Sequence, residues 1–416
     1  MDRPKSVLEW RIATKLYNSL PKASPNSMTA RILLAFLATA GFFYVNIMPA
    51  LVDGLKQGLG FTNEQAGLVG SLNVYGAACG TFLIAFIVQR IRWRAVAHLL
   101  LLGLISMDFL SMFVHHPFGL MVARFAHGFI GGMLVGLSFS IIARTKSPDR
   151  TFGMLLLVQV LSGGAGVMSL PLLVPKFGTN VLFAALILFS ITTLVMLQFI
   201  PDYPIPKAAP REVGASVETV KWKPLLLALT AVFLFQAANM GLFAFVIGLG
   251  KAHALDTAFA SETLGIANWF SILGAVLVIT LSTRFGLFRP LLAAMLLTLI
   301  GTYVFNFSEV KWVWIAANIA TGITWNFVIS HLLGMCARFD RTGQAAVWSG
   351  FASKMGLASG PFLASFVIGA GNYSALIKMA LILLVCAMFA LLLPAWLLDH
   401  GAVDGVPGRQ SAECLP

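Results

Sequence analysis

The sequence has few charged residues and few cysteines for its length. Of its 416 residues, 11% are charged and 4 are cysteines. Cys79, Cys336 and Cys386 lie within apolar stretches and Cys414 lies near the end, a spacing that fits neither a disulfide framework nor a metal-ligand set. The sequences Gly-x-x-x-x-Gly-Lys-Ser/Thr, His-Glu-x-x-His and Gly-x-Ser-x-Gly are absent. We therefore expect no enzyme activity, no metal, no cofactor and no direct use of ATP.

The chain is correspondingly rich in apolar residues. They make up 58% of the chain, more than one soluble core can bury. They form runs near the roughly 20 residues of a membrane-spanning helix, longer than the ten-residue alternating segments of a membrane barrel. We predict an all-α integral membrane protein with twelve transmembrane helices, over the runs Ile32–Val52, Ala66–Val88, Ala95–Phe113, Leu120–Ala143, Phe152–Leu173, Val181–Ile200, Pro224–Leu249, Thr263–Leu281, Pro290–Phe305, Trp312–Ala337, Ala345–Ile368 and Ser374–Leu398.

Lysine and arginine are distributed unevenly among the connecting loops. The N-terminal lead and the loops after the second, fourth, sixth, eighth and tenth runs are basic, whereas the other loops hold only Lys56, Lys176, Lys251 and Lys311. Because basic loops stay in the cytoplasm, we expect a plasma (inner) membrane protein with both termini cytoplasmic. This bias accounts for the net charge of +12, so we expect no nucleic-acid partner.

The chain divides into five segments. We predict a cytoplasmic lead at 1–30, a six-helix bundle at 31–200, a cytoplasmic linker rich in proline and charge at 201–223, a second bundle at 224–398 and a cytoplasmic tail at 399–416. Within the lead, Leu8, Ile12, Leu16 and Leu20 recur every four residues among basic ones. This spacing is typical of a helix lying on the membrane surface. A disordered tail is the alternative.

The two bundles are related by an internal repeat. The matching landmarks, with their shifts along the chain, are Gly80 and Gly274 (194), Arg90 and Arg284 (194), the sequence DRT at 149–151 and 340–342 (191), and Pro171 and Pro361 (190). Nearly equal shifts indicate a duplication. Parallel six-helix repeats form transporters whose binding site lies between two halves that rock about it.

Two motifs lie in and after the fourth run: "RFAHGFIGG" and, in the loop that follows, "SPDRTFG". The first is similar to the fourth-span motif Arg-x-x-x-Gly of the major facilitator superfamily of secondary transporters, and the second to the loop that follows that span. The resemblance implies two pseudo-symmetric six-helix bundles, and "VQRIRWR" and "STRFGLFR" are similar to the gating loops, with Arg90, Arg94, Arg284 and Arg289. The first loop lacks the usual Gly-x-x-x-Asp start. The fifth run lacks the Gly-Pro-x-x-Gly-Gly pattern of drug/proton antiporters, so a proton-antiport efflux pump for a drug or secondary metabolite is the alternative function.

Arg124 places a charge inside the fourth run. A charge in hydrocarbon costs at least about 2.5 kcal/mol and needs a partner or water. Asp108 lies at a similar depth, roughly 7 Å below the outer surface, and Asp53 is a rival partner. His127 is three residues from Arg124 on nearly the same face. We predict proton coupling by these four residues, with a purely structural ion pair as the alternative.

A stripe of glycines follows Arg124. Gly128, Gly132 and Gly136 recur every four residues along the same helix. Glycines at this spacing let the backbone of a neighbouring helix approach closely. We expect a tightly packed helix pair here.

Lys354 lies about ten residues into the eleventh run, some 15 Å deep. No acidic residue occurs between Gln344 and Ile368. Its partner is therefore an anionic substrate, a distant carboxylate or, for a snorkelling lysine, the membrane surface. The first possibility predicts an organic anion as substrate.

Other polar residues on the first, seventh and tenth runs predict a central binding path. With Lys354, the candidate substrate-binding residues are Tyr44, Asn46, Gln236, Asn239, Asn318, Thr321, Trp325 and Asn326. Any one of these amides can instead bond helix to helix. The sequence as a whole predicts a monomeric, proton-coupled secondary transporter in the lipid bilayer that moves a small organic, anionic solute by alternating access.

Overall fold

The computed structural model describes residues 21–204, 222–281, 286–339 and 344–400. Every regular element in these ranges is helical. Within the described residues, twelve helical segments are long and apolar enough to cross a membrane, and one of them, Thr257–Val278, runs through two of the helices named next. The helices are α2 (Met28–Asn46), α3 (Met48–Leu59), α4 (Asn63–Ile87), α5 (Trp93–Ser111), α6 (Pro117–Ile142), α7 (Pro148–Phe177), α8 (Asn180–Leu197), α9 (Trp222–Ala252), α10 (Thr257–Phe270), α11 (Ile272–Leu281), α12 (Phe288–Val304), the 3-10 helix η1 (Phe305–Phe307), α13 (Lys311–Arg338), α14 (Gln344–Ile368) and α15 (Tyr373–Asp399).

Two of the predicted spans are interrupted. The run Ile32–Val52 is split at Ile47 into α2 and α3, and Pro49 lies in the first turn of α3, where its missing N–H costs no helix bond. The run Thr263–Leu281 is split at Ser271, between α10 and α11. The Ser271 hydroxyl donates to Asn268 O at the end of α10. The two interruptions fall beside the cavity described below.

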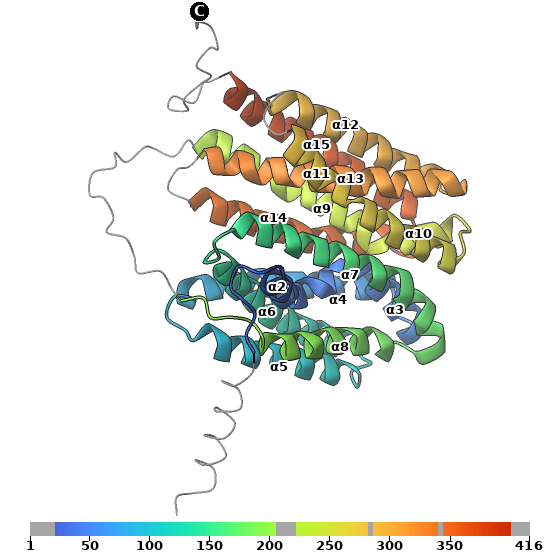
Figure 1. Ribbon diagram of the computed structural model, residues 1–416. Helices are drawn as coiled ribbons and strands as arrows, with labels where there is room; N and C mark the ends of the chain where they lie inside the picture. Colours follow the sequence, from blue (N-terminus) through green and yellow to red (C-terminus); the bar gives the residue numbers. More distant parts are fainter. Residues whose placement is uncertain (1–20, 205–221, 282–285, 340–343, 401–416) are drawn as a thin grey trace, which may run out of the picture.

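The helices form two bundles, α2–α8 and α9–α15. Figure 1 shows the first in blue to green below and the second in yellow to red above. One apolar cluster lies within the first bundle, around Leu34 and Leu101, and another within the second, around Leu291 and Leu332. A third cluster takes residues from both bundles. Each bundle thus has its own core, and the third cluster joins them.

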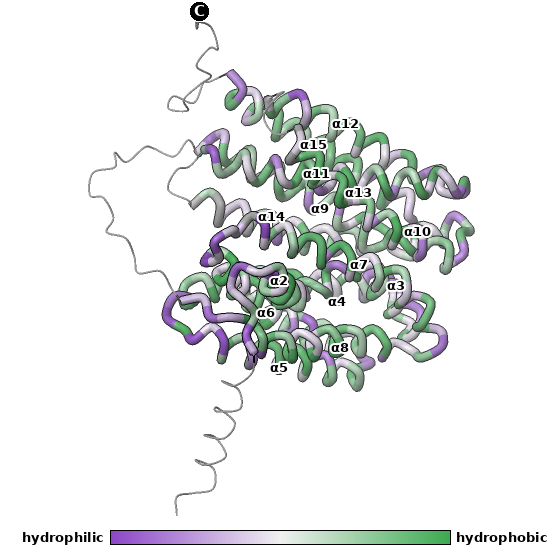
Figure 2. The backbone as a smooth tube through the Cα atoms, in the orientation of Figure 1, coloured by the Kyte–Doolittle hydropathy of each residue, from purple (hydrophilic) through white to green (hydrophobic). Residues whose placement is uncertain are grey.

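The two bundles share two opposite faces. The terminal face is the one at which α2 begins and α15 ends. The far face is the opposite one, at which α3 and α9 end. Figure 2 shows apolar residues along most of the helices and hydrophilic ones gathered at helix ends and connections. Large apolar side chains such as Phe86, Leu99 and Phe109 are exposed. An apolar exterior between polar ends is what a bilayer requires.

Some of the predicted features lie outside the described residues. They are the interfacial helix with Leu8, Ile12, Leu16 and Leu20, most of the linker, Arg284 and the tail beyond residue 400. Of the linker, residues 201–204 are described as non-helical, and α9 begins at Trp222, within the predicted linker.

Candidate functional site: a buried ion network and a cavity between the halves

Close packing of α6 against α4 places the charged residues of α6. A Cβ atom at Gly128 would lie 1.8 Å from Asn73 O, and one at Gly132 would lie 2.0 Å from Ala77 O, so neither position tolerates a side chain without movement. The expected close helix pair is confirmed, with α4 as the neighbour. This packing sets Asn73 beside the turn that carries Arg124 and His127.

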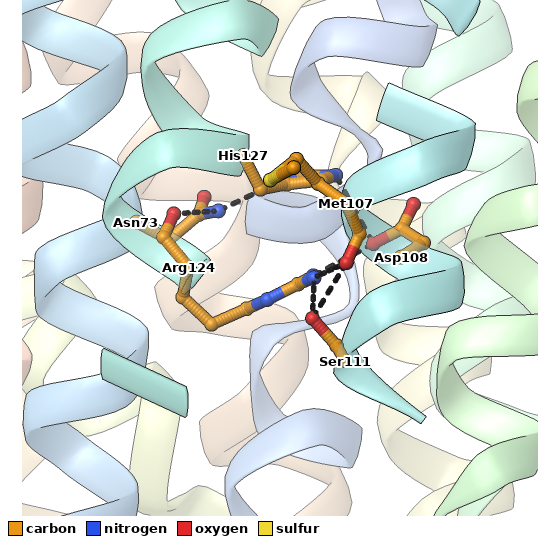
Figure 3. A network of polar contacts seen from close by, with 6 residues as sticks. All are labelled: Asn73, Met107, Asp108, Ser111, Arg124 and His127. Carbon is orange, nitrogen blue, oxygen red and sulfur yellow. Dashed lines mark hydrogen bonds and ion pairs between the residues drawn. The ribbon is translucent and has the colours of Figure 1, made fainter. Parts of the chain in front are cut away.

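Arg124 and Asp108 form a fully buried ion pair between α6 and α5. Arg124 Nη1 lies 2.7 Å from Asp108 Oδ1, and both side chains are 0% exposed. Arg124 Nη2 donates to Met107 O at 2.9 Å and to the Ser111 hydroxyl. Figure 3 shows the guanidinium directed at this end of α5. Of the two carboxylates considered for Arg124, the structure places Asp108 beside it.

His127 and Asn73 extend the network. His127 Nε2 lies 3.3 Å from Asp108 Oδ1, and His127 Nδ1 lies 2.8 Å from Asn73 Nδ2, which also donates to Arg124 O (Figure 3). Tyr44 packs its ring 5.7 Å from the His127 ring. Asp108 Oδ2, Arg124 Nε and the Tyr44 hydroxyl are buried without a hydrogen-bond partner among the described residues. The site therefore holds a carboxylate with a free oxygen that can accept a proton.

Asp53 lies in a different contact, between the halves at the far face. Lys251 Nζ, at the end of α9, lies 2.7 and 2.8 Å from the two Asp53 oxygens. The expectation that Asp53 competes for Arg124 is not met in this conformation, because Asp53 points to the other half. Two hydrogen bonds join the halves nearby, from Lys56 Nζ to the Tyr373 hydroxyl and from Asn63 Nδ2 to Gly369 O. These contacts, together with the shared apolar cluster, close the far face.

A cavity of about 210 Å³ lies between the halves. Helices α2 and α7 supply one wall, and α9, α10, α13 and α14, with Ser271 and Phe305, supply the rest. Six of the predicted substrate-binding residues line it: Asn46, Asn239, Asn318, Thr321, Trp325 and Asn326. No charged side chain of the described residues is part of the lining.

The other predicted binding residues are not part of the lining. Tyr44 packs against His127 in the first half. Gln236 accepts a hydrogen bond from Trp325 Nε1 at 2.7 Å and donates to the Ser353 hydroxyl, so it holds the indole in place. Lys354 donates to the Thr81 hydroxyl across the interface, with its ammonium 5.5 Å from the centre of the Phe42 ring.

Sequence reasoning missed three polar residues of the lining: Gln159, Asn268 and Ser271. Gln159 is a polar residue in an otherwise apolar stretch of the fifth span, a signal that was available. Asn268 lies near the end of α10, and Ser271 is the residue at which the helix is interrupted before α11. The uninterrupted apolar run did not show this break.

Three of the four predicted gating arginines, Arg90, Arg94 and Arg289, lie among the described residues. Arg94 pairs with Asp202 at 2.7 Å and donates to Ile200 O at 2.8 Å, both in its own half. Arg90 and Arg289 are exposed. Their gating role stays a prediction.

The fold and the cavity define a class of protein: a helical membrane protein of two bundles, with a cavity of apolar and uncharged polar residues between them and a buried ion network in one. The sequence matches the Major Facilitator Superfamily over residues 32–352, and the chain belongs to this family of transporters. No curated protein matches the sequence significantly.

Solved structures agree in fold. A mutant of the nucleoside transporter NupG is similar with a TM-score of 0.69 and 14% identity, over 88% of this chain and 99% of that one. A bacterial homologue of the human lysosomal transporter Spinster, inward-facing and unoccupied, is similar with a TM-score of 0.61 and 15% identity, over 90% and 98%. At these identities the likeness establishes the fold.

Proposed function

We propose that the protein moves a small organic solute across the plasma (inner) membrane by alternating access, as a monomer with both termini in the cytoplasm. The observation that carries the proposal is the cavity, whose lining comes from both halves while each half keeps its own core. Rocking of two rigid halves exposes such a cavity to one side at a time. The contacts at the far face then belong to a conformation closed toward the outside.

Counterflow in proteoliposomes tests this proposal. Vesicles holding the purified protein are loaded with unlabelled solute, and the uptake of labelled solute is followed over time. A carrier gives a transient overshoot, whereas a channel equilibrates the label without one. Absence of an overshoot for every compound that binds the protein contradicts alternating access.

We further propose that the Arg124–Asp108–His127 network couples transport to protons. Its support is the carboxylate oxygen left without a partner beside a histidine, whose unperturbed pKa is near 6.5, in a buried site. Tyr44 and Asn46 lie on the same helix, one against His127 and the other in the cavity lining, so α2 connects the two sites.

Separating exchange from accumulation tests the coupling. Asp108→Asn, combined with Arg124→Gln to avoid an unpaired buried charge, is expected to retain counterflow and to lose accumulation driven by a pH gradient. A double variant that accumulates solute normally contradicts the role of this network. His98→Gln, at a histidine of the same half outside the network, is the control.

A second candidate for the solute is an organic anion. One observation favours it: Lys354 has no carboxylate partner among the described residues, and it lies against Phe42, which lines the cavity. A buried ammonium without a counter-ion gains stabilisation from an anionic ligand.

A further inference from the structure

Asn73 of α4 contacts the buried ion network through one atom of its side chain. The residue is 2% exposed, and its backbone oxygen packs against Gly128 of α6. Its amide nitrogen Nδ2 lies 3.0 Å from Arg124 O and 2.8 Å from His127 Nδ1 (Figure 3). The close packing of α4 against α6 thus presents one amide nitrogen to two groups of α6.

These two contacts determine which way the Asn73 amide points. A backbone carbonyl only accepts hydrogen bonds, so the amide nitrogen, and not the amide oxygen, faces Arg124 O. An amide nitrogen has two hydrogens, which it donates, and it does not accept. One hydrogen goes to Arg124 O and the other to His127 Nδ1, so both are in use. His127 Nδ1 is therefore the acceptor of its hydrogen bond with Asn73.

The acceptor role of Nδ1 fixes the tautomer of His127. An imidazole that accepts at Nδ1 is neutral and carries its hydrogen on Nε2. His127 Nε2 lies 3.3 Å from Asp108 Oδ1, so this hydrogen is directed at the carboxylate. Arg124 Nη1 donates to the same oxygen at 2.7 Å, while Asp108 Oδ2 has no partner among the described residues. His127 is thus a donor to Asp108 Oδ1, and Oδ2 is the oxygen left for a proton.

A second proton on His127 conflicts with these contacts. It would place a ring N–H against an N–H of Asn73, and turning the amide over would place its oxygen against Arg124 O. The groups that face the ring from the other helices are Asp108 on α5, the Arg124 guanidinium on α6 and the ring of Tyr44 on α2. A proton on His127 and a proton on Asp108 add the same charge to the network, so charge does not distinguish the two sites. Hydrogen bonding does, because only the first removes the bond from Asn73.

We propose that Asn73 is a positioning residue that keeps His127 neutral, with the hydrogen of the imidazole on Nε2 and directed at Asp108. The transported proton then binds to Asp108 Oδ2, where it forms an O–H bond, and His127 acts only as a hydrogen-bond donor to the carboxylate. This inference rests on the proposed proton coupling, because it divides that role among the members of the same network.

Nitrogen NMR spectra of the full-length protein test the state of His127. The protein carries isotope-labelled histidine and is reconstituted in lipid vesicles without any solute, and the His127 signals are assigned by their loss in His127→Gln or His127→Asn. From about pH 8 to about pH 5, where a solvent-exposed histidine gains a proton, we expect His127 to keep a bare Nδ1 and a protonated Nε2. A hydrogen on His127 Nδ1 in this range, in the other tautomer or in the imidazolium, overturns the proposal.

Substitution of Asn73 tests the contact itself. Asn73→Leu removes the amide hydrogens at a similar side-chain size, so His127 Nδ1 loses the hydrogen bond that it accepts and its signal is expected to shift. Asn73→Ala removes the same donor and takes its place if Asn73→Leu does not fold. Asn306→Leu, at an asparagine of the other half, is the matched control and is expected to leave the His127 signals unchanged. An unchanged Nδ1 signal in a folded Asn73 variant overturns the proposal.

The failure of this inference is distinguishable from the failure of the proposed coupling. The spectra need no solute, whereas the double variant Asp108→Asn with Arg124→Gln is judged by accumulation. Loss of accumulation in the double variant, together with a hydrogen on His127 Nδ1 in the native protein, overturns the role of Asn73 alone. Normal accumulation in the double variant, together with a bare Nδ1, contradicts the coupling and the binding of the transported proton to Asp108, while the hydrogen bond from Asn73 to His127 stands.

Discussion

At the scale of single residues, the ion pair of Arg124 and Asp108 is incompletely satisfied. The guanidinium reaches Asp108 Oδ1, Met107 O and the Ser111 hydroxyl, while Arg124 Nε and Asp108 Oδ2 have no partner among the described residues. Membrane depth suggested Asp108 as the partner, because both residues lie at similar distances from the ends of adjacent helices. The sequence could not show the free oxygen, since that depends on side-chain geometry.

The buried pair predicts a stability difference between single and double variants. Arg124→Gln alone leaves a buried, unpaired carboxylate, and we expect the free energy of unfolding to fall by about 3–5 kcal/mol. Adding Asp108→Asn removes the unpaired charge and is expected to restore most of this loss. Thermal melting of both variants in the same detergent measures the difference. Equal destabilisation of the single and double variants contradicts the pairing.

Lys354 gives a prediction that tests whether the solute is an anion. If the solute is uncharged, Lys354→Met is expected to change its affinity by less than about threefold, because the ammonium bonds to Thr81 and lies outside the lining. If the solute is an anion, loss of a charge-assisted hydrogen bond of about 1.5–3 kcal/mol weakens binding more than tenfold. Equilibrium binding to the purified variant decides, and Thr81→Val, which removes only the hydroxyl partner, is the control.

At the scale of helices, the length of the apolar runs was the feature of the sequence that predicted the membrane spans. A bilayer imposes a span of about 20 residues, so twelve long apolar runs indicated twelve spans. The interruptions at Ile47 and Ser271 were not foreseen, because both residues lie inside continuous apolar runs. Pro49 was the only local cue, and a proline within a membrane helix is common enough that it does not mark a break by itself.

The glycines of α6 predict that the effect of a Gly→Ala substitution on stability depends strongly on its position in the fold. Gly128→Ala puts a methyl group against Asn73 O, and we expect a loss of about 1–3 kcal/mol from overpacking. Gly334→Ala in α13 is the matched control: no atom lies within 4 Å of its added Cβ, so better helix propensity is expected to leave stability unchanged or raised. Thermal melting compares the two. Gly128→Ala as stable as Gly334→Ala contradicts the close contact between α4 and α6.

At the scale of the whole molecule, the contacts between the two halves could not be predicted from the sequence. Asp53 and Lys251 are 198 positions apart, and each was visible only as a charge near a helix end. Asn318 and Asn326, chosen because they lie on a span expected to line the central path, do line the cavity, whereas Gln236, chosen in the same way, does not. Lys354, chosen for its charge and depth, is also outside the lining. Which way a side chain points depends on helix rotation, and that is set by packing across the whole interface.

The ion pair of Asp53 and Lys251 predicts which substitution increases the population of molecules that are open at the far face. The pair is partly exposed and is worth about 1 kcal/mol, so Asp53→Asn is expected to raise the population open at the far face about fivefold. Ser365→Cys reports on this opening, because Ser365 is buried against Gly67 of the other half. In a background with the native cysteines replaced, the rate of maleimide labelling at position 365 is expected to rise by the same factor. The exchanged pair Asp53→Lys with Lys251→Asp restores the attraction and is expected to return the rate to its original value, whereas an unchanged rate in Asp53→Asn means that the apolar cluster alone closes the far face.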